Sequence, residues 1–262
     1  MQPIGARRIF TALIFAALSA LGIVALLSAL GPDWSVYAPA TCTTTRCFCE
    51  MPRVGALIVQ PANSWSSYGY VFAGFLMILL AAGRDWSSAM PRIAATMFGI
   101  TAISVGLGSV LLHATLTLWG QFYDVLGMYL VASFMLVSGL SRWLRIPDKP
   151  TIALYLLLCG ALVTVLIAEP EVRRWLFAVE LILAIIIEMG FARPKRAGVQ
   201  VRYYLLGILA KAVAFTIWNL DQHGIVCSPT SLLQGHAIWH LLGATSIFLT
   251  FLYYRSERRG GA

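Results

Sequence analysis

Two histidines four residues apart, His236 and His240, open the apolar stretch LLQGHAIWHLLGATSIFLTFLYY, residues 232 to 254. In a helix this spacing places both imidazoles on one face. Imidazole is polar and titrates near neutral pH, so exposure to lipid would cost free energy. The pair therefore either packs against other helices or supplies two nitrogen ligands to a metal ion.

A third histidine, His113, stands four residues after Ser109, and Asp124 lies in the next apolar stretch. Three imidazoles with an open fourth position are the ligand set of a catalytic zinc site, where bound water has a pKa of about 7. A carboxylate such as Asp124 can accept that water's proton, and a hydroxyl such as Ser109 can stabilise an oxyanion. A single histidine is more often a packing residue, but three at one depth beside an aspartate favour a metal site.

The composition places these residues in a membrane. The chain has 262 residues, of which 59% are hydrophobic and 11% charged, and its mean hydropathy is +0.79. A soluble domain of this length could not bury so much apolar surface. The net charge of +8 does not indicate nucleic-acid binding, because the basic residues lie between apolar runs and form no single patch.

Eight apolar runs are each long enough to cross about 30 Å of hydrocarbon as a helix. We therefore predict an all-α integral membrane protein, a seven-transmembrane helix bundle with one extra N-terminal transmembrane helix. The predicted spans are Ile9–Leu30, Ser66–Ala82, Ile93–His113, Leu118–Leu140, Thr151–Ala168, Trp175–Phe191, Tyr203–Asn219 and Leu233–Tyr254.

Lysine and arginine concentrate in alternate connections between the spans. The opposite connections hold only Arg46, Arg53, Arg173 and Arg174. Cytoplasmic loops are rich in basic residues, so we expect both termini in the cytoplasm. The four residues His113, Asp124, His236 and His240 then share one depth, toward the outer or lumenal face.

This topology divides the chain into four parts. Residues 1–31 form the extra helix or a signal anchor, residues 32–65 an outer entry segment, residues 66–254 the bundle, and residues 255–262 a basic cytoplasmic tail. A cleaved signal peptide is the alternative for the first part. Its apolar core exceeds the usual 7 to 15 residues, which favours a retained helix.

Four of the five cysteines, Cys42, Cys47, Cys49 and Cys227, fall on the predicted outer side, where disulfides can form. Four cysteines allow three pairings, and spacing alone does not choose among them. A zinc–thiolate site in the stretch CTTTRCFC is the weaker alternative on this side of a membrane.

Other polar residues lie in or beside the spans. We expect Lys211 to form an ion pair with Glu180 or Glu188 of the preceding span, with a lipid-headgroup contact as the alternative. Asp221 is expected to anchor the outer loop rather than to bind substrate. Asn63 is expected to hydrogen-bond near the entrance of the site.

Four segments, taken together, resemble the alkaline ceramidase family, part of a superfamily that includes the adiponectin-receptor-like seven-helix proteins. They are CFCEMPRVGALIVQPANSWSSYGYVFAG, GLGSVLLHATLTLWGQFYDVLGMYL, WNLDQHGIVC and QGHAIWHLL. Their order along about residues 47 to 245 makes the resemblance specific. It implies a membrane hydrolase that cleaves the amide of ceramide into a sphingoid base and a fatty acid.

The resemblance also implies roles for single residues. Ser109 would steady the oxyanion, and Asp124 would handle the proton of the attacking water. A disulfide would join Cys49 to Cys227, which leaves Cys42 and Cys47 to pair locally. The implied zinc ligands are His113, His236 and His240.

A calcium site known in the animal members of this family is poorly matched. Glu50 corresponds to one of its ligands, but the other expected positions fall on or near Cys47, Pro52 and Gln60. One carboxylate is a poor ligand set for a cation that prefers six to eight oxygens. We therefore expect zinc and doubt calcium, and we expect a divergent member of the family.

We interpret the sequence as a zinc-dependent intramembrane amide hydrolase that acts on ceramide or a related N-acyl lipid through attack of zinc-bound water. The expected partner is this membrane lipid, without nucleic acid or an obligate protein partner. A receptor or regulator with structural zinc is the alternative, and a direct Asp124–zinc bond would favour it. A proton-coupled transporter is a third possibility, because Lys211, Glu180 and Glu188 place polar groups toward the other face.

Overall fold

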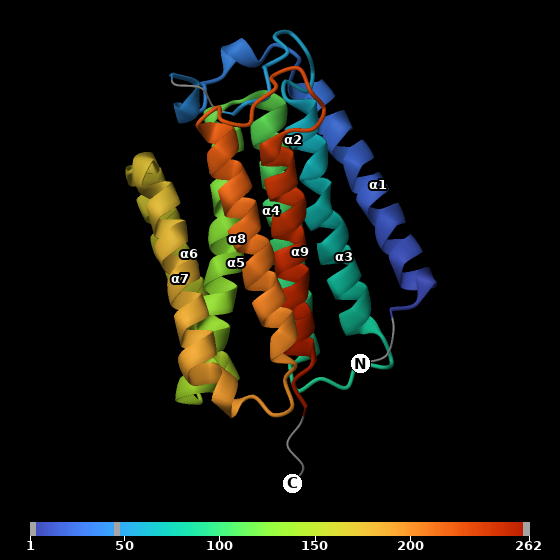
Figure 1. The fold of residues 1–262 in the computed structure, drawn as a ribbon, viewed down its shortest axis with the longest axis vertical. Coiled ribbons are helices and arrows are strands. Elements are labelled where there is room, and N and C mark those ends of the chain that lie inside the picture. The colour runs from blue at the N-terminus through green and yellow to red at the C-terminus, as the bar shows by residue number, and fades with distance from the viewer. Residues whose placement is uncertain (1–3, 45–47, 259–262) are drawn as a thin grey trace.

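The computed structural model describes residues 4–44 and 48–258. Figure 1 shows long helices that run side by side, with both termini at one end of the bundle and long loops at the other. Within the described chain eight helical spans are long and apolar enough to cross a membrane, which confirms the predicted fold class. The main helices are α1 (Ala6–Leu30), α2 (Pro61–Ser66), α3 (Tyr68–Ala82), α4 (Arg92–Thr115), α5 (Leu118–Leu144), α6 (Asp148–Ala168), α7 (Arg173–Ile187), α8 (Val201–Gln222) and α9 (Gly235–Arg255).

Helix α4 lies inside the bundle and packs against α3 and α5. Its contact with α5 is close because Gly108 has no side chain. A Cβ at Gly108 would lie 2.2 Å from the carbonyl oxygen of Tyr123 on α5, so any larger residue would push the helices apart. This close approach brings Ser109 on α4 next to Asp124 on α5.

Helix α1 lies on the outside of the bundle, along α3 (Figure 1). It buries small residues such as Ala12 and Ala16, and Phe15 packs on Phe75 with ring centroids 5.5 Å apart. Arg8 forms an ion pair with Asp85 in the connection between α3 and α4. The extra helix is therefore tied to the first helix of the predicted seven-helix bundle.

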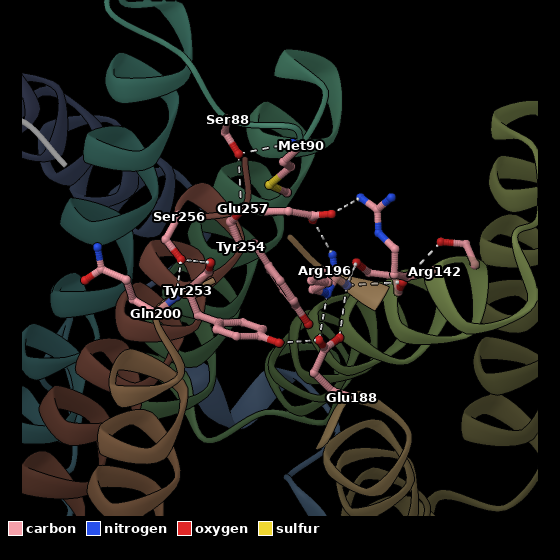
Figure 2. Close-up of polar contacts among 12 residues, drawn as sticks. Ser88, Met90, Arg142, Glu188, Arg196, Gln200, Tyr253, Tyr254, Ser256 and Glu257 are labelled. Carbon is pink, nitrogen blue, oxygen red and sulfur yellow. Dashed lines mark hydrogen bonds and ion pairs between the residues drawn. The ribbon is translucent and has the colours of Figure 1, made fainter. Parts of the chain in front are cut away.

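A buried ionic network closes the end of the bundle where the termini lie, which we call the terminal end (Figure 2). Arg196 donates to Glu188 from Nε at 2.6 Å and from Nη2 at 3.0 Å. Its Nη1 donates to Glu257 at 2.9 Å, and Glu257 also pairs with Arg142 of α5 at 2.7 Å. Glu188 begins a π-helical turn after α7, so the network joins the ends of α5, α7 and α9.

The opposite end, which we call the histidine end, is covered by the entry segment and by the loop before α9 (Figure 1). A disulfide joins Cys49 of the entry segment to Cys227 of that loop. The backbone N–H groups of Val59 and Gln60 donate to the carbonyl oxygens of Ala114 and His113, both at 3.0 Å. These bonds fix the entry segment over the C-terminal turn of α4. The expected pairing of Cys42 with Cys47 lies outside the described residues, because Cys47 is not among them.

Candidate functional site

Three buried imidazoles converge at the histidine end. His113 comes from the last turn of α4, and His236 and His240 come from the first two turns of α9. One ring nitrogen from each lies within 4.8 Å of the others, and the side chains are only 1%, 6% and 3% exposed. The predicted spacing therefore brings three nitrogen donors to one point inside the bundle.

The orientation of His113 is fixed by Gln60. Its Nδ1 lies 3.0 Å from Gln60 Oε1, and Gln60 Nε2 donates to the backbone carbonyl of Glu50 at 2.8 Å. Because the amide oxygen only accepts, His113 carries its proton on Nδ1. Its Nε2 therefore presents a lone pair to the centre of the cluster, as in a metal-ligating histidine.

His240 is oriented by hydroxyl groups where α2 meets α3. Its Nδ1 lies 2.9 Å from Ser66 Oγ and 3.2 Å from Ser67 Oγ. Both serines also donate to the backbone carbonyl of Asn63, so their positions are fixed by α2 itself. His240 Nε2 then faces the other two imidazoles and Ser109.

The contact between His113 and His236 tests whether the cluster fits a metal. Their Nε2 atoms lie 3.1 Å apart, and the Nε2 of His113 carries no proton. At this distance His236 Nε2 either donates its own N–H to His113 or shares a cation with it. Two nitrogens on a tetrahedral zinc, each at 2.0–2.1 Å, are about 3.3 Å apart, so this pair has the spacing of zinc ligands.

Ser109 and Asp124 stand beside the histidines. Ser109 Oγ lies 3.2 Å from His240 Nε2 and 3.0 Å from Ser67 Oγ. Ser109 also lies close to the Asp124 carboxyl group. The serine thus connects a carboxylate on α5 to the imidazole cluster. Asp124 is not part of the group of three nitrogen donors.

Phe48 covers the cluster on the side of the loops. Its ring centroid lies 4.5 Å from that of His113 and 4.2 Å from that of His236. A cavity of about 300 Å³ lies against Phe48 and is also lined by Glu50, Gln60 and Leu116. Sequence reasoning missed Phe48, Ser66 and Ser67 altogether, because no motif or periodic pattern marks them.

A protein-family model described as Ceramidase matches residues 40–259, which is most of the chain. The chain belongs to the ceramidase family. A comparison with curated proteins finds no match. Membership implies a hydrolase that acts on amide bonds and a lipid substrate of the ceramide type. Together with the eight apolar helices, it indicates a multi-pass membrane protein.

In this ceramidase-family protein Glu50 has a structural role. Its two carboxylate oxygens accept the backbone N–H groups of Ala62 and Asn63, both at 2.8 Å, and so cap the start of α2. Burial raises the pKa of Glu50, and these two hydrogen bonds oppose that rise. The carboxylate is committed to holding α2, which carries the partners of His240.

The side chains of Asp221 and Asn63 differ in their hydrogen bonds. Asp221 accepts the N–H of Gly235 at 3.1 Å and that of Cys49 at 3.4 Å, so it ties the start of α9 to the entry segment. The Asn63 side chain is fully buried, and no hydrogen bond to it is found within the described residues. The expected side-chain bond at the site entrance is therefore not formed there; the Asn63 backbone carbonyl is used instead.

The predicted ion pair of Lys211 is wrong. Glu188 is paired with Arg196 at the terminal end, and Glu180 accepts a hydrogen bond from Ser133. The Lys211 ammonium lies 3.6 Å from the ring centroid of Trp239 on α9. Helix α8 places Lys211 level with the second turn of α9, whereas Glu188 lies at the end of α7, so the two charges cannot meet.

Proposed function

We propose that this protein is a zinc-dependent intramembrane hydrolase of ceramide or a related N-acyl lipid. The observation that carries the proposal is the convergence of His113, His236 and His240 beside Ser109 and Asp124. Zinc, when bound by the three imidazoles, supplies Lewis-acid polarisation of the amide carbonyl and lowers the pKa of water. The products are a fatty acid and an amine.

The protein's own residues supply proton transfer and charge stabilisation. Asp124 accepts the proton of the attacking water and passes it to the nitrogen of the leaving amine. Ser109 donates a hydrogen bond to the oxygen that gains negative charge. Both groups are already aligned, because Ser109 contacts both Asp124 and His240 before any substrate is present.

The surrounding residues hold this arrangement. Gln60 keeps the lone pair of His113 directed inward, and the serines at the start of α3 do the same for His240. Phe48 separates the imidazoles from the cavity under the loops, which limits the entry of bulk water. The acyl chains would then reach the site from the side, between helices.

We further propose the topology expected from the distribution of basic residues. Both termini lie in the cytoplasm, and the histidine end faces the outer or lumenal side. The entry segment and the disulfide of Cys49 with Cys227 support this assignment, because disulfides persist in oxidising compartments. The division into an extra helix (1–31), an entry segment (32–65), a bundle (66–254) and a tail (255–262) is part of the same proposal.

A panel of N-acyl lipids tests the proposed function. Purified protein should release fatty acid from ceramide or a related amide, and a chelator should stop the release. Asp124→Asn should lower the rate by roughly 10²–10⁴-fold, and Ser109→Ala by about 10²-fold. Ser104→Ala is the matched control, because Ser104 lies on the same helix, is half-buried, and donates to the carbonyl of Ile100 in its own backbone turn.

Absence of hydrolysis of every N-acyl lipid, with the protein folded and zinc bound, would contradict the hydrolase. That outcome would leave a receptor or regulator with structural zinc. Full activity in Asp124→Asn would remove this residue from the mechanism.

A further inference from the structure

Lys211 is a cation inside a membrane span that the proposed mechanism does not use. Its ammonium rests on the face of Trp239 at 3.6 Å, and the ring of Phe177 on α7 lies 5.6 Å away. Among residues 4–44 and 48–258, no side chain or carbonyl forms a hydrogen bond or ion pair with it. An aromatic face compensates only part of the hydration that an ammonium group loses in a bilayer.

The carboxylates of the neighbouring helices have other partners. Glu180 on α7 accepts from Ser133 through one carboxylate oxygen and forms no ion pair with Lys211 within the described residues, and Glu188 is held by Arg196. Asp221, at the end of α8, accepts backbone N–H groups from the entry segment and from α9. The charge of Lys211 is therefore left for an anion that comes from outside the protein.

Lys211 lies at the depth of the histidine cluster. Trp239, which it contacts, directly precedes His240, and Lys211 is close enough to His240 to interact with it electrostatically. The Lys211 side chain is half-buried, so part of it is accessible from outside the protein. Hydrolysis of an N-acyl lipid at the cluster consumes one water, breaks the C–N bond, and yields a carboxylate and an ammonium group at this depth.

We propose that Lys211 and Trp239 form a carboxylate-binding site for the fatty acid released by hydrolysis. The inference rests on the proposed function for the source of the acid, but the binding itself needs no turnover. The carboxylate pairs with the ammonium, and the acyl chain lies among the apolar side chains between α7 and α8. An acidic phospholipid headgroup offers similar chemistry and is distinguished by the test.

Quenching of tryptophan fluorescence by stearic acid brominated on the carbon next to the carboxylate tests this site. Bromine quenches at contact, and a carboxylate paired with Lys211 places this bromine beside Trp239. The matched probe is the alcohol brominated at the same carbon, which lacks only the charge. Wild-type protein in uncharged detergent should be quenched by the acid at about tenfold lower concentration than by the alcohol. Lys211→Met should remove this difference, Lys211→Arg should keep it, and Trp239→Phe should remove the acid-specific part of the signal.

Equal quenching of wild type by acid and alcohol, or an unchanged difference in Lys211→Met, would overturn the site. So would competition by a dibrominated acidic phospholipid at lower concentration than the fatty acid. The same titration in Asp124→Asn, which should not hydrolyse the lipid, measures binding of the acid without turnover. Acid-specific quenching without any lipid hydrolysis in wild type would leave the site standing and remove the hydrolase. Hydrolysis without acid-specific quenching would leave the hydrolase standing and remove the carboxylate-binding site.

Discussion

The two ends of the bundle both bury polar side chains, but they do so in opposite ways. At the terminal end Arg196 donates to Glu188 and Glu257, and a second arginine, Arg142, completes the pairing of Glu257. At the histidine end ring nitrogens face each other, and the Nε2 atoms of His113 and His236 lie 3.1 Å apart. The first arrangement pairs charges of opposite sign, and the second gathers ring nitrogens that can share a cation.

This difference distinguishes polar groups that are buried to stabilise the fold from polar groups that are buried to bind a ligand. A buried ion pair that is fully matched needs no ligand, and breaking it is costly because one charge is left without a partner. A cluster of neutral nitrogens with inward lone pairs gains little by itself and gains much from a metal. We therefore expect substitutions at the terminal end to change stability, and those at the histidine end to change metal binding and turnover.

Glu188→Ala should have the largest effect on stability. It leaves the buried guanidinium of Arg196 with Glu257 as its acidic partner, which should lower the free energy of unfolding by about 3–5 kcal/mol. Unfolding in mixed micelles of increasing denaturing detergent measures this change. Glu171→Ala is the control, since Glu171 is 75% exposed and pairs only loosely with Arg173 at 3.5 Å. A loss of zinc from folded Glu188→Ala protein would contradict the separation of the two ends.

Gln60→Ala, at the histidine end, should have an effect of intermediate size, in this case on zinc affinity. Without the amide oxygen, His113 is free to change tautomer and ring orientation, and zinc affinity should fall by about 10–100-fold. Competition with a zinc chelator gives the affinity. Gln200→Ala at the terminal end, where the side chain accepts a hydrogen bond from exposed Arg202, should leave the zinc affinity unchanged. Equal zinc affinity in Gln60→Ala and wild type would mean that Gln60 does not position His113.

Loss of the Arg8–Asp85 ion pair should have the smallest effect, a small decrease in the free energy of unfolding. The hydrogen bond from Arg8 lowers the pKa of Asp85 to about 2. The pKa of Asp85 in the folded protein is thus below the ordinary value of about 3.9. Its contribution to the free energy of unfolding is therefore present above pH 4 and is lost as the pH falls toward 2. Both groups are partly exposed, so we expect less than about 1 kcal/mol, reduced further by salt. Asp85→Asn should remove this part of the acid dependence of unfolding; an identical acid profile in the variant would contradict it.

The fold was predictable from sequence because membrane helices reveal themselves by length and hydropathy. The histidine triad was predictable for a related reason. Antiparallel neighbours place the end of α4 and the start of α9 at one depth, so His113, His236 and His240 had to lie at the same level. Asp124 and Ser109 followed from the same reasoning about depth and helix face.

The residues that orient the triad were not predictable in this way. Gln60 and Phe48 belong to a segment held by hydrogen bonds to α4, and no periodic pattern specifies such contacts. The partner of Lys211 was predicted wrongly because Glu180 and Glu188 are near in sequence. Arg196, which follows the π-helical turn after α7, takes Glu188 instead. Competition among charges in a bundle depends on three-dimensional positions that spacing does not encode.

The zinc content of purified protein tests the central claim most directly. Wild type should retain about one zinc ion per chain, and His236→Ala and His240→Ala should each lose it, because two imidazoles hold zinc weakly. Asp124→Asn should keep the ion while losing turnover. Full zinc content in either histidine variant, with the protein folded, would show that the three imidazoles do not share one metal, and would contradict the account.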